Sequence, residues 1–104
     1  MIPVTVTARH CEIEPELRER AEAIARRLGA LTPFAQEATV VFDAGPNAGL
    51  VELRLNLAGG KILVAKGEAQ EHRSALDLAE AKIRRQLEQS SAKPRRKGRG
   101  AARA

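Results

Sequence analysis

Apolar and polar residues alternate at the start of the chain. Over residues 2–8 every second side chain is apolar, which is the period of a β-strand with one buried face. Pro3 lies near the beginning of this segment and favours an edge position or a frayed end, because proline cannot donate a hydrogen bond to a neighbouring strand. We therefore predict a half-buried first strand over residues 2–8.

A helical period follows. Pro15 suits a first helical position, where its missing N–H would have no partner, and Gly29 is a plausible stop. Between them the apolar residues recur at helical spacing, at Leu17, Ala21, Ile24 and Leu28. Arg26 and Arg27 lie off this apolar stripe. The pattern predicts an amphipathic helix from Pro15 to about Gly29.

Alternation returns in the middle of the chain. It predicts strands over residues 37–44 and 51–57, separated by a turn cluster at 45–47. Gly59 and Gly60 then favour a two-residue hairpin turn into a fourth strand. Such a turn would place Ile62 opposite Leu57 on the apolar face, and Leu63 on the other face.

The last predicted helix covers residues 71–89. Its core stripe consists of Leu76, Ala79, Ile83 and Leu87. One flank combines cations with acids four residues away, at Arg73, Asp77, Glu80, Arg84 and Glu88. On the other side Lys82 and Arg85 are one turn apart, and no acid follows Lys82 at the favoured spacing. Such a pair can straddle phosphates or form an ordinary solvated face.

The predicted order is β-α-β-β-β-α, an α+β fold. A four-stranded mixed sheet would carry both helices on one face, as a two-layer sandwich. The helix between the first two strands allows them to pair in parallel. We expect one domain over residues 1–91 and a disordered basic tail over 92–104.

The net charge of +5 is distributed unevenly along the chain. Six of the 18 Lys and Arg residues lie beyond residue 91, so residues 1–91 hold 12 cations against 13 acids. The tail cations are Lys93, Arg95, Arg96, Lys97, Arg99 and Arg103. A basic arm on a near-neutral body is typical of nucleic-acid binding, although a purely solubilising extension has the same composition.

Phenylalanine is the only aromatic residue besides histidine, at Phe34 and Phe42. Proteins that read single-stranded bases need aromatic platforms for stacking. Both side chains lie at positions where they could fill a core. If the protein binds RNA, it should then contact the backbone and the shape of the RNA rather than splayed bases.

Several classes of function are disfavoured. The chain has no signal peptide and no apolar run long enough for a membrane span, which favours the cytoplasm. Cys11, His10 and His72 lack the spacing of a zinc site, and no polar constellation suggests catalysis. We expect no enzyme activity, no cofactor, no metal and no small-molecule substrate.

The order and spacing of several motifs resemble the ribosome hibernation promoting factor family. This family is also called ribosome-associated inhibitor A or sigma-54 modulation protein. The matching pieces are ARH with EI at 8–13, PELR at 15–18, VELRL with LAGG at 51–60, and ALDLA, KI and RQL at 75–87. The chain resembles the short form of the family.

The resemblance implies a fold similar to double-stranded-RNA-binding domains. It implies binding to the small ribosomal subunit, to 16S rRNA and neighbouring ribosomal proteins in the mRNA and tRNA channel, with inhibition of translation under stress or in stationary phase. By motif match, Lys82 and Arg85 would be the best rRNA contacts, followed by Arg9 and His10. Arg26 and Arg27 are candidates because the family's first helix is commonly basic.

Two other functions remain open at this point. A protein-interaction regulator of the sigma-factor type would need an exposed apolar patch, for which Leu63 and Leu78 are the candidates. A generic module for structured RNA would share the cations without the preference for ribosomes.

Overall fold

Six elements build the protein. The computed structural model describes residues 2–46 and 48–92. The elements run in the predicted order, as β1 (Val4–Ala8), α1 (Pro15–Ala30), β2 (Ala35–Ala44), β3 (Gly49–Leu57), β4 (Ile62–Ala69) and α2 (His72–Ala92). Their bounds differ from the predicted ones by up to three residues, and the predicted tail cations Lys93, Arg95, Arg96 and Lys97 lie outside the described residues.

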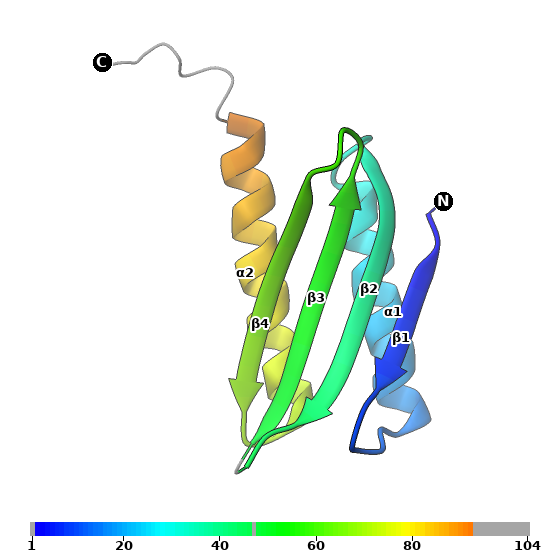
Figure 1. Cartoon of the computed structure of the whole chain (residues 1–104), viewed down its shortest axis with the longest axis vertical. Coiled ribbons are helices and arrows are strands. Elements are labelled where there is room, and N and C mark those ends of the chain that lie inside the picture. Colours follow the sequence, from blue (N-terminus) through cyan, green and yellow to red (C-terminus); the bar gives the residue numbers. More distant parts are fainter. Residues whose placement is uncertain (1, 47, 93–104) are drawn as a thin grey trace, which may run out of the picture.

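The four strands form one sheet in the order β1-β2-β3-β4. β1 pairs in parallel with β2, and the other two pairs are antiparallel. Both helices cover the same face and leave the other face open (Figure 1). This confirms the α+β two-layer sandwich and the parallel pairing of the first two strands. No described helix combines the length and the apolar character that crossing a membrane requires.

The core lies between the helices and the inner face of the sheet. Its largest fully buried side chains come from every element except β1 and β4, and are Phe42, Ile24, Leu53, Leu55, Leu76, Ile83, Val40 and Val51. Val4 and Val6 of β1 pack against this core while partly exposed, as expected of an edge strand.

The turn between β3 and β4 is one residue longer than predicted. The amide of Leu57 donates to the carbonyl of Lys61 at 2.7 Å, so Ala58, Gly59 and Gly60 form a three-residue loop. Both glycines have positive φ, at 86° and 82°, which only glycine adopts readily. A hairpin with glycine is therefore confirmed, but the two-residue turn is wrong.

The longer turn reverses the faces of β4. Leu63 pairs with Leu55 and is only 7% exposed, whereas Ile62 is 50% exposed. A shift of one residue moves every side chain of a strand to the opposite face. The predicted placement of Ile62 inside and Leu63 outside is therefore wrong. Because Leu63 is buried, it cannot belong to an exposed apolar patch.

The corrected register places Gly67 under α2. A Cβ atom at this position would collide with the carbonyl oxygen of Ala75 and would press against the amide of Ala79. The backbones of β4 and α2 thus lie so close together that only a residue without a side chain fits between them. Gly67 sets the distance between the last helix and the sheet.

We expect Gly67→Ala to lower the free energy of unfolding by about 1–3 kcal/mol, because backbone atoms of α2 would have to move. Gly29→Ala is the matched control. A Cβ atom there meets only the flexible end of the Ile2 side chain, and alanine favours a helix by up to about 1 kcal/mol. Urea unfolding of the two variants should therefore give opposite or clearly unequal shifts, and equal losses would contradict the packing described.

Candidate nucleic-acid interface

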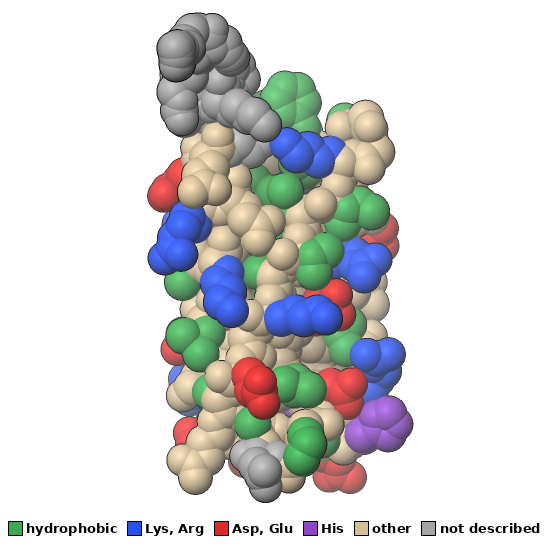
Figure 2. Space-filling model, turned by 60° about the vertical axis from the view of Figure 1, so that its left-hand side comes forward, with side chains coloured by type: hydrophobic (Ala, Val, Ile, Leu, Met, Phe, Trp, Pro, Cys, Tyr) green, Lys and Arg blue, Asp and Glu red, His purple; other side chains and the backbone are tan. Residues whose placement is uncertain are grey.

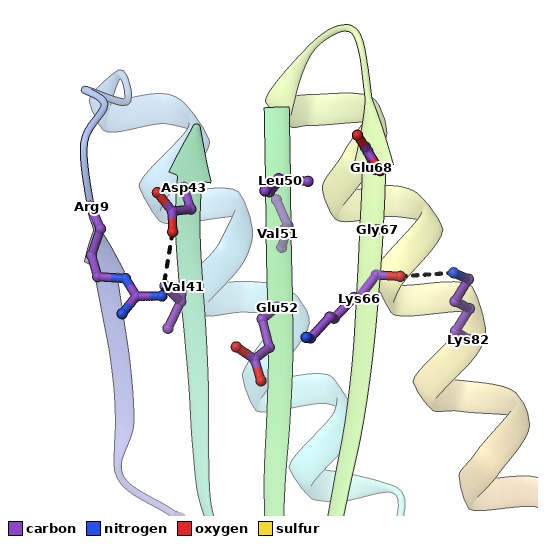
Figure 3. A pocket seen from close by; sticks show the side chains of 10 residues that line it. All are labelled: Arg9, Val41, Asp43, Leu50, Val51, Glu52, Lys66, Gly67, Glu68 and Lys82. Atoms are coloured by element: carbon purple, nitrogen blue, oxygen red, sulfur yellow. Dashed lines mark hydrogen bonds and ion pairs between the residues drawn. The ribbon is translucent and has the colours of Figure 1, made fainter. Parts of the chain in front are cut away.

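The α2 flank with Lys82 lies along the free edge of β4. The Lys82 Nζ donates to the carbonyl oxygen of Lys66 at 2.8 Å, and Gln86 Nε2 donates to the carbonyl oxygen of Val64 at 2.9 Å (Figure 3). These two side chains, one turn apart, therefore satisfy carbonyl groups that a neighbouring strand would otherwise bind. Lys82 is held in place, but its partner is neutral, so its positive charge is not offset.

Arg85 extends this basic flank. It is exposed and has no hydrogen bond or ion pair to any other described residue. Of the two α2 cations predicted to be neutralised, Arg84 is paired with Glu80, whereas Arg73 has no hydrogen bond or ion pair to a described residue. The predicted difference from Lys82 and Arg85 therefore holds only for Arg84. Lys82 has an additional role at the sheet edge that its sequence position did not reveal.

Arg9 and His10 follow β1 and share one acidic partner. Arg9 Nη2 lies 3.4 Å from Asp43 Oδ2, and His10 Nδ1 lies 3.2 Å from Asp43 Oδ1. The amide of Ala44 also donates to Asp43, at 2.8 Å. This amide is the main reason why the pKa of Asp43 is lowered, with His10 next. The carboxylate weakens the attraction of Arg9 and His10 for an anion.

The structure brings Arg9 and Lys82 to one hollow on the open side of the sheet. Arg9 enters from the β1 side and Lys82 from the α2 side, and Lys66 lies between them (Figure 3). Lys66 was missed from the sequence because its face depends on the turn length. Carboxylates also line the hollow, from Asp43, Glu52 and Glu68. It is therefore mixed in charge rather than a cationic pocket.

The sheet face continues this mixture. Arg54, also missed, lies opposite Thr39 on β2 and Val64 on β4, and pairs with Glu52 at 3.4 Å. Figure 2 shows the basic side chains of the α2 and β4 side spaced among hydrophobic and acidic ones. Recognition of a polyanion would therefore depend on a few placed cations more than on one dense patch.

Arg26 and Arg27 lie apart from this group, on α1. Arg27 Nη2 is 3.5 Å from Glu80 Oε2 of α2, and Arg26 lines a separate hollow near the end of α1. The structure therefore divides the predicted RNA contacts. Arg9, His10, Lys82 and Arg85 belong to the sheet and the β4 edge, and the α1 pair belongs to the helix layer.

Ion pairs connect the two helices. Arg84 pairs with Glu80 at 3.1 Å, which confirms one predicted contact within α2. Asp77, however, pairs with Arg20 of α1 at 2.7 Å, and this contact raises the pKa of Arg20. The predicted pairing of Asp77 with Arg73 is not formed, because a cation of the neighbouring helix occupies the carboxylate.

The His, Cys, Asp and Glu side chains of the fold are the candidates for metal binding and for reactivity. Within residues 2–46 and 48–92, no three His, Cys, Asp or Glu side chains form a group that could hold a metal ion. Cys11 is free, and burial is the main reason why its pKa is raised. A raised pKa leaves less of the reactive thiolate.

The two phenylalanines have different environments. Phe42 is fully buried and meets the ring of His72 edge-on, with centroids 5.8 Å apart. Phe34 is 63% exposed. Phe34 therefore does not fill the core. It lies in the turn just before β2, where periodicity gives no information on burial.

Comparisons with known proteins agree with this fold. The sequence matches the family described as sigma 54 modulation protein / S30EA ribosomal protein over residues 4–95. A ribosomal subunit interface protein from Coxiella burnetii is 22% identical, with a TM-score of 0.76 over 88% of this chain and 99% of that one. The N-terminal domain of Thermus thermophilus Protein Y is 21% identical, with a TM-score of 0.72 over 86% and 99%. A comparison with curated proteins finds no significant match.

The lowered pKa of Asp43 predicts a pH dependence of stability. A carboxyl with a lower pKa in the folded state stabilises the fold above its unfolded pKa, and this contribution disappears as the pH falls through the folded value. Asp43→Asn should therefore be less stable than wild type at neutral pH, and the difference should shrink below about pH 4. Urea unfolding of both proteins between neutral pH and the acidic range measures this difference in stability.

Glu19→Gln is the control, since Glu19 is exposed and has no hydrogen bond or ion pair among the described residues. Its difference from wild type should change less with pH. A difference between Asp43→Asn and wild type that stays constant down to about pH 2 would contradict the role of this carboxylate.

Proposed function

Because the chain belongs to the sigma 54 modulation protein / S30EA ribosomal protein family, we propose that it is a non-enzymatic ribosome hibernation factor. It binds the small ribosomal subunit in the channel for mRNA and tRNA, contacts 16S rRNA and neighbouring ribosomal proteins, and inhibits translation under stress or in stationary phase. The observation that carries this proposal is the family match, which spans all six elements of the fold. Because its proposed partner is the ribosome, the protein acts in the cytoplasm in this proposal.

The arrangement of α2 supports RNA as the partner. Lys82 keeps an uncompensated charge while a carbonyl group fixes its position, and Arg85 follows one turn later. A cation that is already held in place loses less conformational entropy when it meets a phosphate. The Lys82 and Arg85 side chains can therefore provide a positioned contact to the RNA backbone.

The basic tail supports a second, less specific contribution. The six tail cations have no acidic residue among them, whereas the preceding residues are near neutral. Long-range attraction to RNA is then supplied mainly by the tail, and such attraction weakens steeply with salt. In this proposal the folded domain determines placement and the tail raises affinity.

We expect the pair Lys82→Gln with Arg85→Gln to weaken binding to small subunits by about tenfold or more, because two charge-assisted contacts are lost. Glutamine is chosen because it can still donate to the Lys66 carbonyl and protect the edge of β4. Sedimentation of purified small subunits with each variant measures binding.

The matched control is Arg73→Gln with Arg84→Gln, which removes the same charge from the same helix. Arg73 lies near the acidic start of α1, and Arg84 is already paired with Glu80. This control should bind nearly as wild type does. Equal losses for both pairs would show that only total charge matters, and wild type that does not sediment with small subunits at low salt would refute the proposed function.

Deleting residues 93–104 tests the tail separately. It should weaken binding while leaving the protected rRNA nucleotides unchanged. With six cations removed, the slope of log affinity against log salt should become shallower by up to about four. Titrations at several salt concentrations, together with chemical probing of the rRNA, measure both effects. A shortened chain that loses all binding would place the site in the tail instead.

A further inference from the structure

Phe34 is the most exposed large hydrophobic side chain among the described residues. It lies between α1 and β2, at the end of the molecule that also holds the β3–β4 hairpin and the C-terminal end of α2 (Figure 1). Leu31 and Ile62, at the same end, are about half exposed. An aromatic ring in water at a defined place in the fold is a candidate contact.

The backbone holds Phe34 firmly. Its amide donates to the hydroxyl of Thr32 at 3.2 Å, and its carbonyl accepts from the amide of Ala58 at 2.8 Å. The segment is thereby fastened both to its own turn and to the hairpin. A ring presented from a fixed backbone has only two side-chain torsions to restrict when it binds a partner.

Two cations of the described residues, Arg26 and Lys61, lie at this end of the protein, together with one acid, Glu37. Pro33 and Ala35, the neighbours of Phe34 in sequence, line a hollow together with Arg26. Lys61 belongs to the hairpin that bonds Phe34. Beyond Ala92 the sequence continues with the six tail cations. A hollow at the opposite end is lined by four acids, Glu12, Glu14, Glu16 and Glu71, together with Arg73 and His72.

We propose that Phe34 is a stacking platform for an unpaired nucleobase. The inference rests on the proposed function, in which RNA is the partner, and adds a contact to a base at the end of the domain where the tail begins. Arg26, which lies far from Lys82 in the fold, then contacts the phosphate backbone beside the stacked base. The sequence-based expectation of binding through RNA backbone and shape alone is replaced by one base contact.

A nucleobase explains this surface better than an apolar protein segment. An apolar partner would gain from Phe34, Leu31 and Ile62 but nothing from the adjacent cations. A single-stranded nucleic acid uses both, because its bases stack on aromatic rings while its phosphates meet Lys and Arg.

The experiment compares two oligonucleotides of equal length and charge. Fluorescence anisotropy of the full chain is recorded with an oligoadenylate of about eight nucleotides and with a matched abasic ribose-phosphate oligomer, at about 0.15 M salt. Tail and backbone contacts contribute to both complexes, so the ratio of affinities isolates the bases. Wild type should prefer the oligoadenylate by about tenfold.

Three substitutions of Phe34 separate stacking from apolar packing. Phe34→Leu keeps the apolar character and should abolish the preference, whereas Phe34→Trp should keep or increase it. Phe34→Ala should behave as Phe34→Leu does. Since the ring is exposed, all three should retain the wild-type melting temperature within a few degrees. A preference that survives in Phe34→Leu, or wild type that binds both oligomers equally, overturns the proposal.

Binding to ribosomal subunits is scored independently. Chemical probing of rRNA in small-subunit complexes should show a base protected by wild type and Phe34→Trp but not by Phe34→Leu. If wild type shows the oligoadenylate preference yet does not sediment with small subunits, the stacking site stands and the proposed ribosomal function fails. If wild type sediments and no base loses protection in Phe34→Leu, the stacking site fails alone.

Discussion

The close approach of α2 to β4 at Gly67 is the contact on which the candidate interface depends. A side chain at this position would collide with the backbone of Ala75. Because Gly67 has no side chain, α2 packs close to β4, and Lys82 and Gln86 reach the carbonyl groups at the edge of that strand. The same packing buries Leu76 and Ile83 against the sheet. The position of the helix, the protection of the β4 edge and the placement of Lys82 therefore follow from one missing Cβ atom.

Side chains from the helices protect both edges of the sheet. At the β1 edge Arg18 Nη1 donates to the carbonyl of Val6 at 3.0 Å, and at the β4 edge Lys82 and Gln86 do the same for two carbonyls. Strand edges with free backbone groups invite pairing with other chains. A small domain that must remain available for a large partner benefits from closing them. At the β4 edge Lys82 is exposed, so the residue that protects the edge also presents a positive charge at the surface.

The cations of the domain fall into two groups, those paired with carboxylates and those that are not. Arg20 and Arg27 of α1 pair with carboxylates of α2, Arg84 pairs with Glu80 within α2, and Arg9 pairs with Asp43. Such exposed pairs contribute little stability, about 0–1 kcal/mol each, but they remove cations from the field that a polyanion would feel. Lys82 meets only a carbonyl. The body of the protein is therefore nearly neutral as a whole while a few cations remain placed for contact, and the sequence puts the excess charge in the tail.

Local periodicity was enough to determine the order of the elements, the inner faces of β1 and β3, and the core stripe of each helix, because burial on one side imposes a period on the sequence itself. It also predicted the pair of Glu80 with Arg84 in α2, since partners within a helix lie at fixed spacing. The face of β4, the exposure of Phe34 and the pairing of Asp77 with Arg20 were decided only by the tertiary structure. Two- and three-residue turns both accept Gly59 and Gly60, and the choice between them depends on which strand face packs under α2. Contacts between residues far apart in the chain leave no spacing to detect, so only the folded arrangement of the helices and the sheet determines them.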